Sequence, residues 1–219
     1  MIKTLLILLF MFPSLLWAEK TIEGVTVASL KKDKGRLISA KASKIFELDI
    51  KTVSKKVIDF ENKCNNDLRR KRKLISKESN CLYPNKNVIE AVKLPSLKPN
   101  CKKCFLIFRR IYNRSYFQHY DLIESSSSGI STIINHRMLS NEKLSEYITQ
   151  PKKTRSAFKS LSGQFKLTKL EDKKTKVEYF YKAYTENWLL NLEITQNTLL
   201  ENVANGVRAT IDAIGIVHE

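Results

Sequence analysis

The feature that most constrains the fold is a pair of strands followed at once by a long amphipathic helix. Residues 161–170 and 176–184 alternate apolar and polar side chains, which predicts two antiparallel strands joined at residues 171–174. A helix is predicted to begin near Trp188. Its apolar stripe has helical spacing and comprises Leu192, Leu199, Leu200, Val203, Ala204, Val207, Ile211 and Ile214. Because a one-sided sheet and a one-sided helix must bury their apolar faces, we expect them to pack together.

The earlier part of the chain predicts further antiparallel strands around a helical stretch. Strands are predicted twice within 24–50 and at 87–93, 105–112, 116–124 and 130–139, a turn at 125–129, and helices at 49–73 (divided near residues 65–66) and 141–148. The expected fold class is α+β, with a curved antiparallel sheet gripping the C-terminal helix. A curved sheet seldom closes fully on a helix, so an apolar cavity is expected between them. Gly206 is expected to let another backbone approach this helix.

The N-terminus has the pattern of a cleavable export signal. Lys3 precedes an apolar run over residues 5–11, and residues 15–18 end on the small residue Ala18. The run is too short to span about 30 Å of hydrocarbon, which takes a helix of about 20 residues. We therefore divide the chain into a signal peptide, 1–18, and a single domain, 19–219, exported to the periplasm or secreted. An uncleaved N-terminal anchor is the alternative.

The charge balance is strongly basic, with 39 Lys and Arg against 22 Asp and Glu and a net charge of +17. In a cytosolic protein this excess would point to nucleic acid, whose phosphates bind basic side chains. Export argues against a nucleic-acid partner and favours anionic lipid or acidic polysaccharide, which attract a cationic surface through the same long-range field. A merely solvated basic surface is the alternative interpretation.

One run of basic residues is a candidate for binding an anionic membrane surface. It comprises Arg69, Arg70, Lys71, Arg72 and Lys73. Each basic side chain near an anionic bilayer contributes about 1 kcal/mol. The same run would also suit the solvated C-terminal end of a helix, where the helix dipole favours cations. The sequence leaves both interpretations open.

The four cysteines, Cys64, Cys81, Cys101 and Cys104, predict disulfides, because an even number in an exported chain is most simply a set of bridges. We favour the pairs 64–81 and 101–104. A four-thiolate zinc site would usually show two short Cys-x-x-Cys segments, and only residues 101–104 match. A thioredoxin-like redox site would place that motif at a helix start. Here a strand-like segment follows, so no metal site is expected.

The sequence lacks the common motifs of nucleophilic and metal-dependent catalysis. There is no Gly-x-Ser-x-Gly elbow and no His-Glu-x-x-His pair, so we expect no catalytic residues and no enzyme activity. His119 and His136 lie on predicted neighbouring strands, together with Arg109, Arg110, Tyr120 and Asp121. If His119 faces the cavity, it is a candidate polar group for the head of a ligand. A hydrogen-bonded histidine within the sheet is the alternative.

Three segments resemble START-like lipid-transfer domains, members of the helix-grip superfamily also called SRPBCC. Residues 23–60 resemble the opening hairpin and first helix of the family, and residues 162–179 resemble its last hairpin. Residues 188–191 resemble its closing lid. The resemblance covers roughly 22–62 and 160–215. At 65–73 the chain departs from the family, which often has a Trp-rich stretch there.

This resemblance implies a pocket for a lipid or another hydrophobic small molecule and no obligatory cofactor. The expected pocket wall consists of Phe165, Leu167, Val177, Tyr179 and Tyr181 on the sheet and of Leu199 and Val203 on the helix. Buried apolar area would supply affinity at about 25 cal/mol per Å². Each of these side chains would also suit an ordinary core. Two other functions stay open: a cationic envelope protein that docks on anionic lipid or polysaccharide, and a cyclase- or hydrolase-type enzyme.

Overall fold

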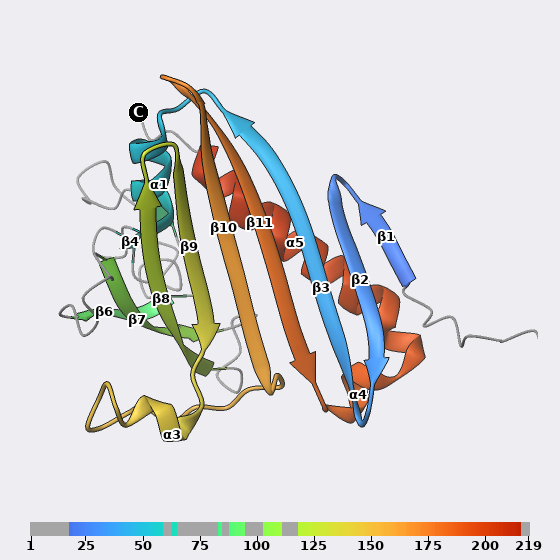
Figure 1. Ribbon diagram of the computed structural model, residues 1–219. Coiled ribbons are helices and arrows are strands. Elements are labelled where there is room, and N and C mark those ends of the chain that lie inside the picture. Colours follow the sequence, from blue (N-terminus) through green and yellow to red (C-terminus); the bar gives the residue numbers. More distant parts are fainter. Residues whose placement is uncertain are drawn as a thin grey trace, which may run out of the picture.

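The computed structural model describes residues 18–58, 63–64, 83–84, 88–94, 103–110 and 118–215. Nine strands within these ranges form one antiparallel sheet in the order β1-β2-β3-β11-β10-β9-β8-β7-β6 (Figure 1). They are β1 (Ala18–Ile22), β2 (Val25–Lys32), β3 (Gly35–Phe46), β6 (Val88–Leu94), β7 (Lys103–Arg110), β8 (Gln118–Ser128), β9 (Ser131–Met138), β10 (Ser160–Glu171) and β11 (Lys174–Thr185). A separate parallel pair joins β4 (Lys63–Cys64) to β5 (Tyr83–Pro84).

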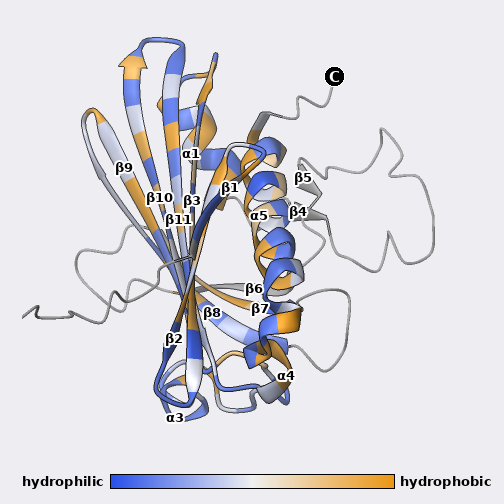
Figure 2. Cartoon of the chain, turned by 90° about the vertical axis from the view of Figure 1, so that its right-hand side faces the viewer, coloured by the Kyte–Doolittle hydropathy of each residue, from blue (hydrophilic) through white to orange (hydrophobic). Residues whose placement is uncertain are grey.

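Four helices accompany the sheet in the described ranges: α1 (Ile50–Ile58), α3 (Asn141–Leu144), α4 (Trp188–Asn191) and α5 (Glu193–Gly215). The helices α1 and α5 lie on one face of the sheet, called here the inner face (Figure 2). The sequence-based prediction of an α+β fold, with a curved antiparallel sheet around a C-terminal helix, is therefore confirmed.

The middle of the sheet joins the two ends of the chain. The hairpin β2–β3 closes over Asp33 and Lys34, and Asp33 takes the positive φ of 52° that such a tight turn requires. The strand β3 then pairs with β11 along its whole length, so that Ala40 lies opposite Tyr181. The hairpin β10–β11 closes over residues 172–173. Of these strands, β2, β3 and β11 form the surface against which α5 packs, and α1 contacts β10.

The main core lies between the inner face and the helices. One continuous apolar cluster contains the buried stripe of α5, the buried residues of α1 and the alternate side chains of the sheet. A smaller cluster, which includes Leu106 and Phe108, covers the opposite, outer face of β7 and β8. Alternate residues of β7 and β8 belong to different clusters, because neighbouring side chains of a strand point to opposite faces of the sheet.

The C-terminal helix is interrupted, which corrects the prediction of one helix from Trp188. Leu192 has an extended backbone with φ of −66° and ψ of 136°, and its side chain is exposed instead of joining the apolar stripe. The hydroxyl of Thr195 donates to the carbonyls of Leu189 and Leu192 at 2.7 and 2.9 Å. The Thr195 hydroxyl thus bonds the Leu189 carbonyl, which has lost its helical N–H partner, while the Leu192 carbonyl also accepts from the Thr195 backbone N–H at 3.2 Å.

Three further expectations were wrong. Within the helix predicted at 49–73, residues 50–58 form α1 but residues 63–64 pair with β5 as a strand, and residues 59–62 and 65–73 lie outside the described part. The serines at 125–128, expected to turn, extend β8, where the hydroxyl of Ser127 lies 3.0 Å from that of Thr132 on β9. Gly206 is exposed, and no atom outside its own helix lies within 4 Å of where its Cβ would be, so no backbone approaches it.

The sequence also missed β1, the edge strand that pairs with β2. It begins at Ala18, the last residue of the predicted signal peptide, so the predicted cleavage would leave the strand from Glu19 onward. No helix in the described part of the chain is long and apolar enough to cross a bilayer.

Candidate functional site

A group of polar side chains is buried on the inner face of β7, β8 and β9. Register places Arg109 opposite His119 and Ile107 opposite Asp121, while His136 lies opposite Ile123. His119 and Asp121 are two residues apart on one strand, so both point to the same face. Their neighbours Ile107 and Ile123 belong to the main apolar core. The polar group is therefore surrounded by apolar side chains.

The centre of this polar group is the carboxylate of Asp121, which is fully buried. The Nε of Arg109 lies 3.0 Å from Asp121 Oδ2, and the Nε2 of His119 lies 3.1 Å from Oδ1. These are ion-pair distances, but the N–H directions do not meet hydrogen-bond geometry at either contact. Both ring nitrogens of His119 and Nδ1 of His136 are buried without a hydrogen-bond partner. Unsatisfied buried polar atoms are costly in a folded protein, so such a group requires an explanation.

His136 connects this polar group to the part of the sheet that faces α5. Its Nε2 lies 2.8 Å from the hydroxyl of Tyr179, and the Tyr179 ring stacks on Phe165 with ring centroids 4.2 Å apart. The connection depends on Gly163, which lies opposite His136 on β10. A Cβ at residue 163 would collide with His136 Nε2. Only glycine lets the histidine ring lie across this strand.

The charges in this group shift several pKa values. Burial works against the ionised form of Asp121, but the charges of His119 and Arg109 outweigh it and hold the pKa of Asp121 well below its usual range. Burial also disfavours the protonated form of His136 and lowers its pKa to about 4, although the nearby Asp121 charge opposes this shift. Burial raises the pKa of the Tyr179 hydroxyl. At neutral pH the structure thus holds a charged Asp121 beside a neutral His136.

These shifts predict that the protein loses stability as the pH falls. Between about pH 6.5 and about pH 4 the unfolded chain protonates His136 while the folded protein does not, so the free energy of unfolding decreases by roughly 3 kcal/mol. Asp121 adds a loss in the same direction below about pH 4, where the unfolded carboxyl takes up its proton. Urea unfolding at a series of pH values measures this dependence. His136→Phe should flatten it between pH 6.5 and 4, and an equal slope in that variant would contradict the assignment.

The seven residues expected to line the pocket all contact the main core. Phe165, Leu167, Val177, Tyr179, Leu199 and Val203 are buried, and Tyr181 is half-buried against the same cluster. All seven therefore belong to one apolar cluster, in which α5 packs on β2, β3 and β11 and α1 packs on β10. Whether they contact a ligand stays a prediction. His119, the expected polar pocket group, lies on the same inner face with only 2% of its surface exposed.

Two cavities that are lined by described residues lie on the outer face of the sheet. A groove of about 840 Å³ crosses the sheet beside outward-facing residues such as Ser39, Gln164 and Phe180. A pocket of about 390 Å³ lies between Phe108 and Tyr120 on the sheet and the segment 147–152 after α3. Both lie on the face of the sheet opposite α5, whereas the pocket expected from the sequence is on the inner face.

Some predicted sites lie outside the described residues. The basic run Arg69, Arg70, Lys71, Arg72 and Lys73 is one of them. Cys104 is disulfide-bonded, but Cys81, Cys101 and the side chain of Cys64 lie outside the described part. The pairs 64–81 and 101–104 therefore stay a prediction.

Sequence reasoning noticed the residues of the polar group but not their arrangement. Only His119 was expected as a polar group, and Arg109, Arg110, Tyr120 and Asp121 lie beside it on the predicted strands. The two-residue spacing of His119 and Asp121 is the signal that could have placed both on one face. Neither the hydrogen bond between His136 and Tyr179 nor the close approach of His136 to Gly163 has a signal in the sequence. Both depend on strand order, which places β10 between two segments that are distant in sequence.

Comparison with known proteins supports the fold. No protein-family model matches the chain, and no curated protein matches it. Among solved structures, human STARD10 superposes with a TM-score of 0.54 at 14% identity, over 90% of this chain and 72% of that one. A STAR-related lipid transfer protein from Xanthomonas axonopodis gives 0.51 at 13% identity, over 91% and 96%. Human StAR-related lipid transfer protein 5 gives 0.51 at 11% identity, over 90% and 86%.

Proposed function

We propose that this chain, which has the START-like helix-grip fold, binds a lipid or another hydrophobic small molecule between the inner face of its sheet and α5. The structures it resembles include proteins described as lipid-transfer proteins. The inner face and the stripe of α5 provide a continuous apolar surface that includes Phe165, Leu167 and Val203. Affinity for an apolar molecule would come from removing that molecule's surface from water.

The observation that carries this proposal is the buried, incompletely hydrogen-bonded polar group beside that apolar surface. A ligand with a hydroxyl or carboxyl at one end would find partners in His119 and His136, whose Nδ1 atoms are both unbonded. Arg109 adds a positive charge that favours an oxygen-rich group. The apolar remainder would extend along Tyr179 and Phe165 toward α5. The polar group would therefore select a ligand with one polar end and orient that end toward His119 and His136.

We further propose that the protein acts outside the cytoplasm, in the periplasm or after secretion, and that it is a binding protein without enzyme activity. The N-terminal sequence, with its short apolar run ending at Ala18, supports export. The net charge of +17 suits encounters with anionic envelope components. The polar group holds Asp121 as a charged, ion-paired carboxylate, which suits fixed recognition of a ligand better than proton transfer.

Ligand uptake tests this function. Delipidated protein should bind a fluorescent fatty acid saturably, at one molecule per chain, and should also bind diphenylhexatriene, an apolar probe without a polar end. His119→Phe should weaken fatty-acid binding about fivefold to tenfold, because one ligand hydrogen bond of about 1–1.5 kcal/mol is lost. Its affinity for the apolar probe should stay unchanged. Fluorescence titration measures both affinities.

The matched control is Asn135→Leu on the outer face of β9, which should leave both affinities unchanged. Mass spectrometry of small molecules bound to protein from its native host identifies the ligand. If neither probe binds, and the native protein carries no apolar molecule, the proposed function is wrong.

A further inference from the structure

Four large apolar side chains are exposed together where the sheet ends and the C-terminal helices begin. Trp188 is 68% exposed, Leu189 48%, Leu192 41% and Ile194 88%. They belong to α4, to the interruption at Leu192 and to the first turn of α5. Leu190, between them, packs on the main core and anchors the segment. Single exposed apolar residues are common, but four within seven residues indicate a contact surface.

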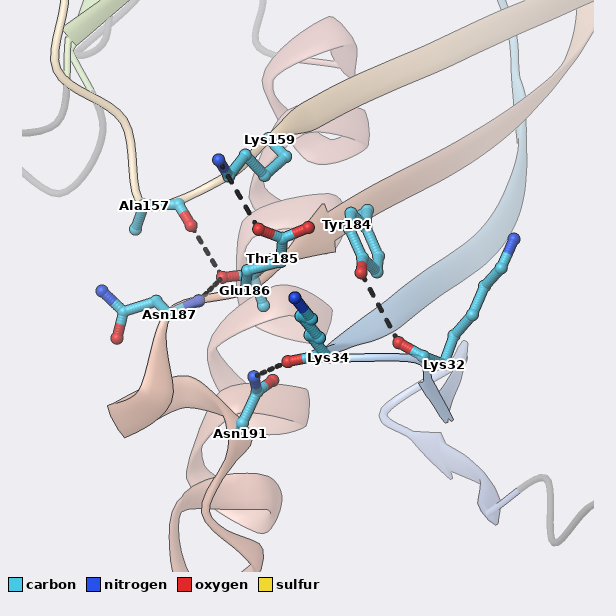
Figure 3. Close-up of polar contacts among 9 residues, drawn as sticks. All are labelled: Lys32, Lys34, Ala157, Lys159, Tyr184, Thr185, Glu186, Asn187 and Asn191. Atoms are coloured by element: carbon cyan, nitrogen blue, oxygen red, sulfur yellow. Dashed lines mark hydrogen bonds and ion pairs between the residues drawn. The ribbon is translucent and has the colours of Figure 1, made fainter.

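The same end of the molecule presents a lysine-rich turn. The hairpin β2–β3 carries Lys31, Lys32 and Lys34, all exposed, against one acid, Asp33. The side-chain amide of Asn191 donates to the carbonyl of Lys34 at 3.1 Å (Figure 3). The buried guanidinium of Arg36 donates to the Asn191 carbonyl at 3.2 Å. These two bonds hold α4 against the hairpin, so the lysines and the apolar side chains are presented together.

The charges around this end leave the lysines of the turn available. Lys159 forms an ion pair with Glu186 at 3.5 Å, so these two charges largely cancel (Figure 3). Glu193 in the first turn of α5 is the acid within the exposed apolar segment. The three hairpin lysines therefore outnumber the two acids of this end, Asp33 and Glu193. The whole protein has a net charge of +17. Long-range attraction to an anionic surface is favourable, and the lysines can orient the approach.

We propose that this end, the tip surface formed by Trp188, Leu189, Leu192, Ile194 and the three hairpin lysines, docks on a bilayer that contains anionic phospholipid. Tryptophan partitions to the level of the headgroups, and leucine and isoleucine insert beneath it. Lysines beside them bind the phosphates of the lipids. A stable protein partner would need about 20–30 residues on each side, whereas a bilayer accepts a few inserted side chains. This docking is separate from the ligand site on the inner face.

Vesicle binding by the proposed exported form, residues 19–219, tests the tip surface. Without the predicted signal peptide, Trp188 is the one tryptophan of the sequence, so the emission reports on it alone. Vesicles of phosphatidylcholine with phosphatidylglycerol should shift this emission to the blue and sediment the protein, and raised salt should weaken the binding. Vesicles of phosphatidylcholine alone should bind at least tenfold more weakly. Changing Trp188 and Leu189 to Ser, or the three hairpin lysines to Gln, should each weaken binding about tenfold or more.

Matched controls use exposed residues elsewhere in the described chain. Ile130→Ser removes an apolar side chain that is 70% exposed at the β8–β9 turn. Lys153, Lys166 and Lys173 changed to Gln remove the same charge as the hairpin triple. Both should bind vesicles like the unchanged protein. Unshifted Trp188 emission, equal binding to neutral vesicles, or equal losses in test and control variants would overturn the proposal. Uptake of the fluorescent probes is measured without vesicles. The vesicle results therefore neither support nor contradict the proposed ligand site.

Discussion

Replacing Asp121 with alanine is expected to lower the free energy of unfolding by about 3–5 kcal/mol, because it leaves the charge of Arg109 without its partner in an apolar part of the sheet. The side chain of Arg109 is 22% exposed, so partial solvation places the expected loss near the lower end of that range. His119 loses its contact with the carboxylate as well. Urea unfolding followed by circular dichroism at neutral pH measures the change.

The control removes both charges at once. Arg109→Met combined with Asp121→Leu should be considerably more stable than Asp121→Ala, since no buried charge is left unpaired. Arg109→Met alone should again be destabilised. If Asp121→Ala unfolds within about 1 kcal/mol of the unchanged protein, the ion pair does not hold this part of the sheet together. The double variant also separates stability from ligand binding, because it should fold and still bind a polar-ended ligand poorly.

Gly163→Ala is expected to cost about 2–4 kcal/mol of stability. The new methyl group would collide with the His136 ring at its Nε2 atom. The ring must therefore move, which adds the cost of overpacking to that of a lost buried hydrogen bond with Tyr179. The pH dependence ascribed to His136 should weaken in the same variant, because a displaced ring would be less buried. Urea unfolding at neutral and acidic pH measures both effects.

Two comparisons make this test specific. Gly206→Ala, in the exposed interior of α5 with no neighbour within 4 Å, should stabilise the protein by up to about 1 kcal/mol through helix propensity. The costs of Gly163→Ala and His136→Ala should not add, because the second change removes the ring with which the methyl group collides. Additive costs, or a Gly163→Ala protein as stable as the unchanged one, would contradict the close approach.

The sequence predicted those parts of the fold that depend on local patterns. The alternation at 161–170 and 176–184 identified β10 and β11, and the stripe from Leu199 to Ile214 identified the buried face of α5. Local patterns fail where a distant segment decides the conformation. Leu192 fits a helical stripe by its spacing, yet Arg36 on β3 and Thr195 hold the chain there in an extended turn.

The candidate site shows the same division. By itself, the sequence identified His119 as a candidate polar group and placed Arg109, His119, Asp121 and His136 on predicted strands, since strand periodicity is local. Only the tertiary structure decided that these side chains meet at a buried carboxylate, that His136 reaches Tyr179 across Gly163, and that Trp188 stays outside the core. The physical reason is that strand order and register are fixed by burying the whole apolar face at once, and this depends on segments far apart in the chain.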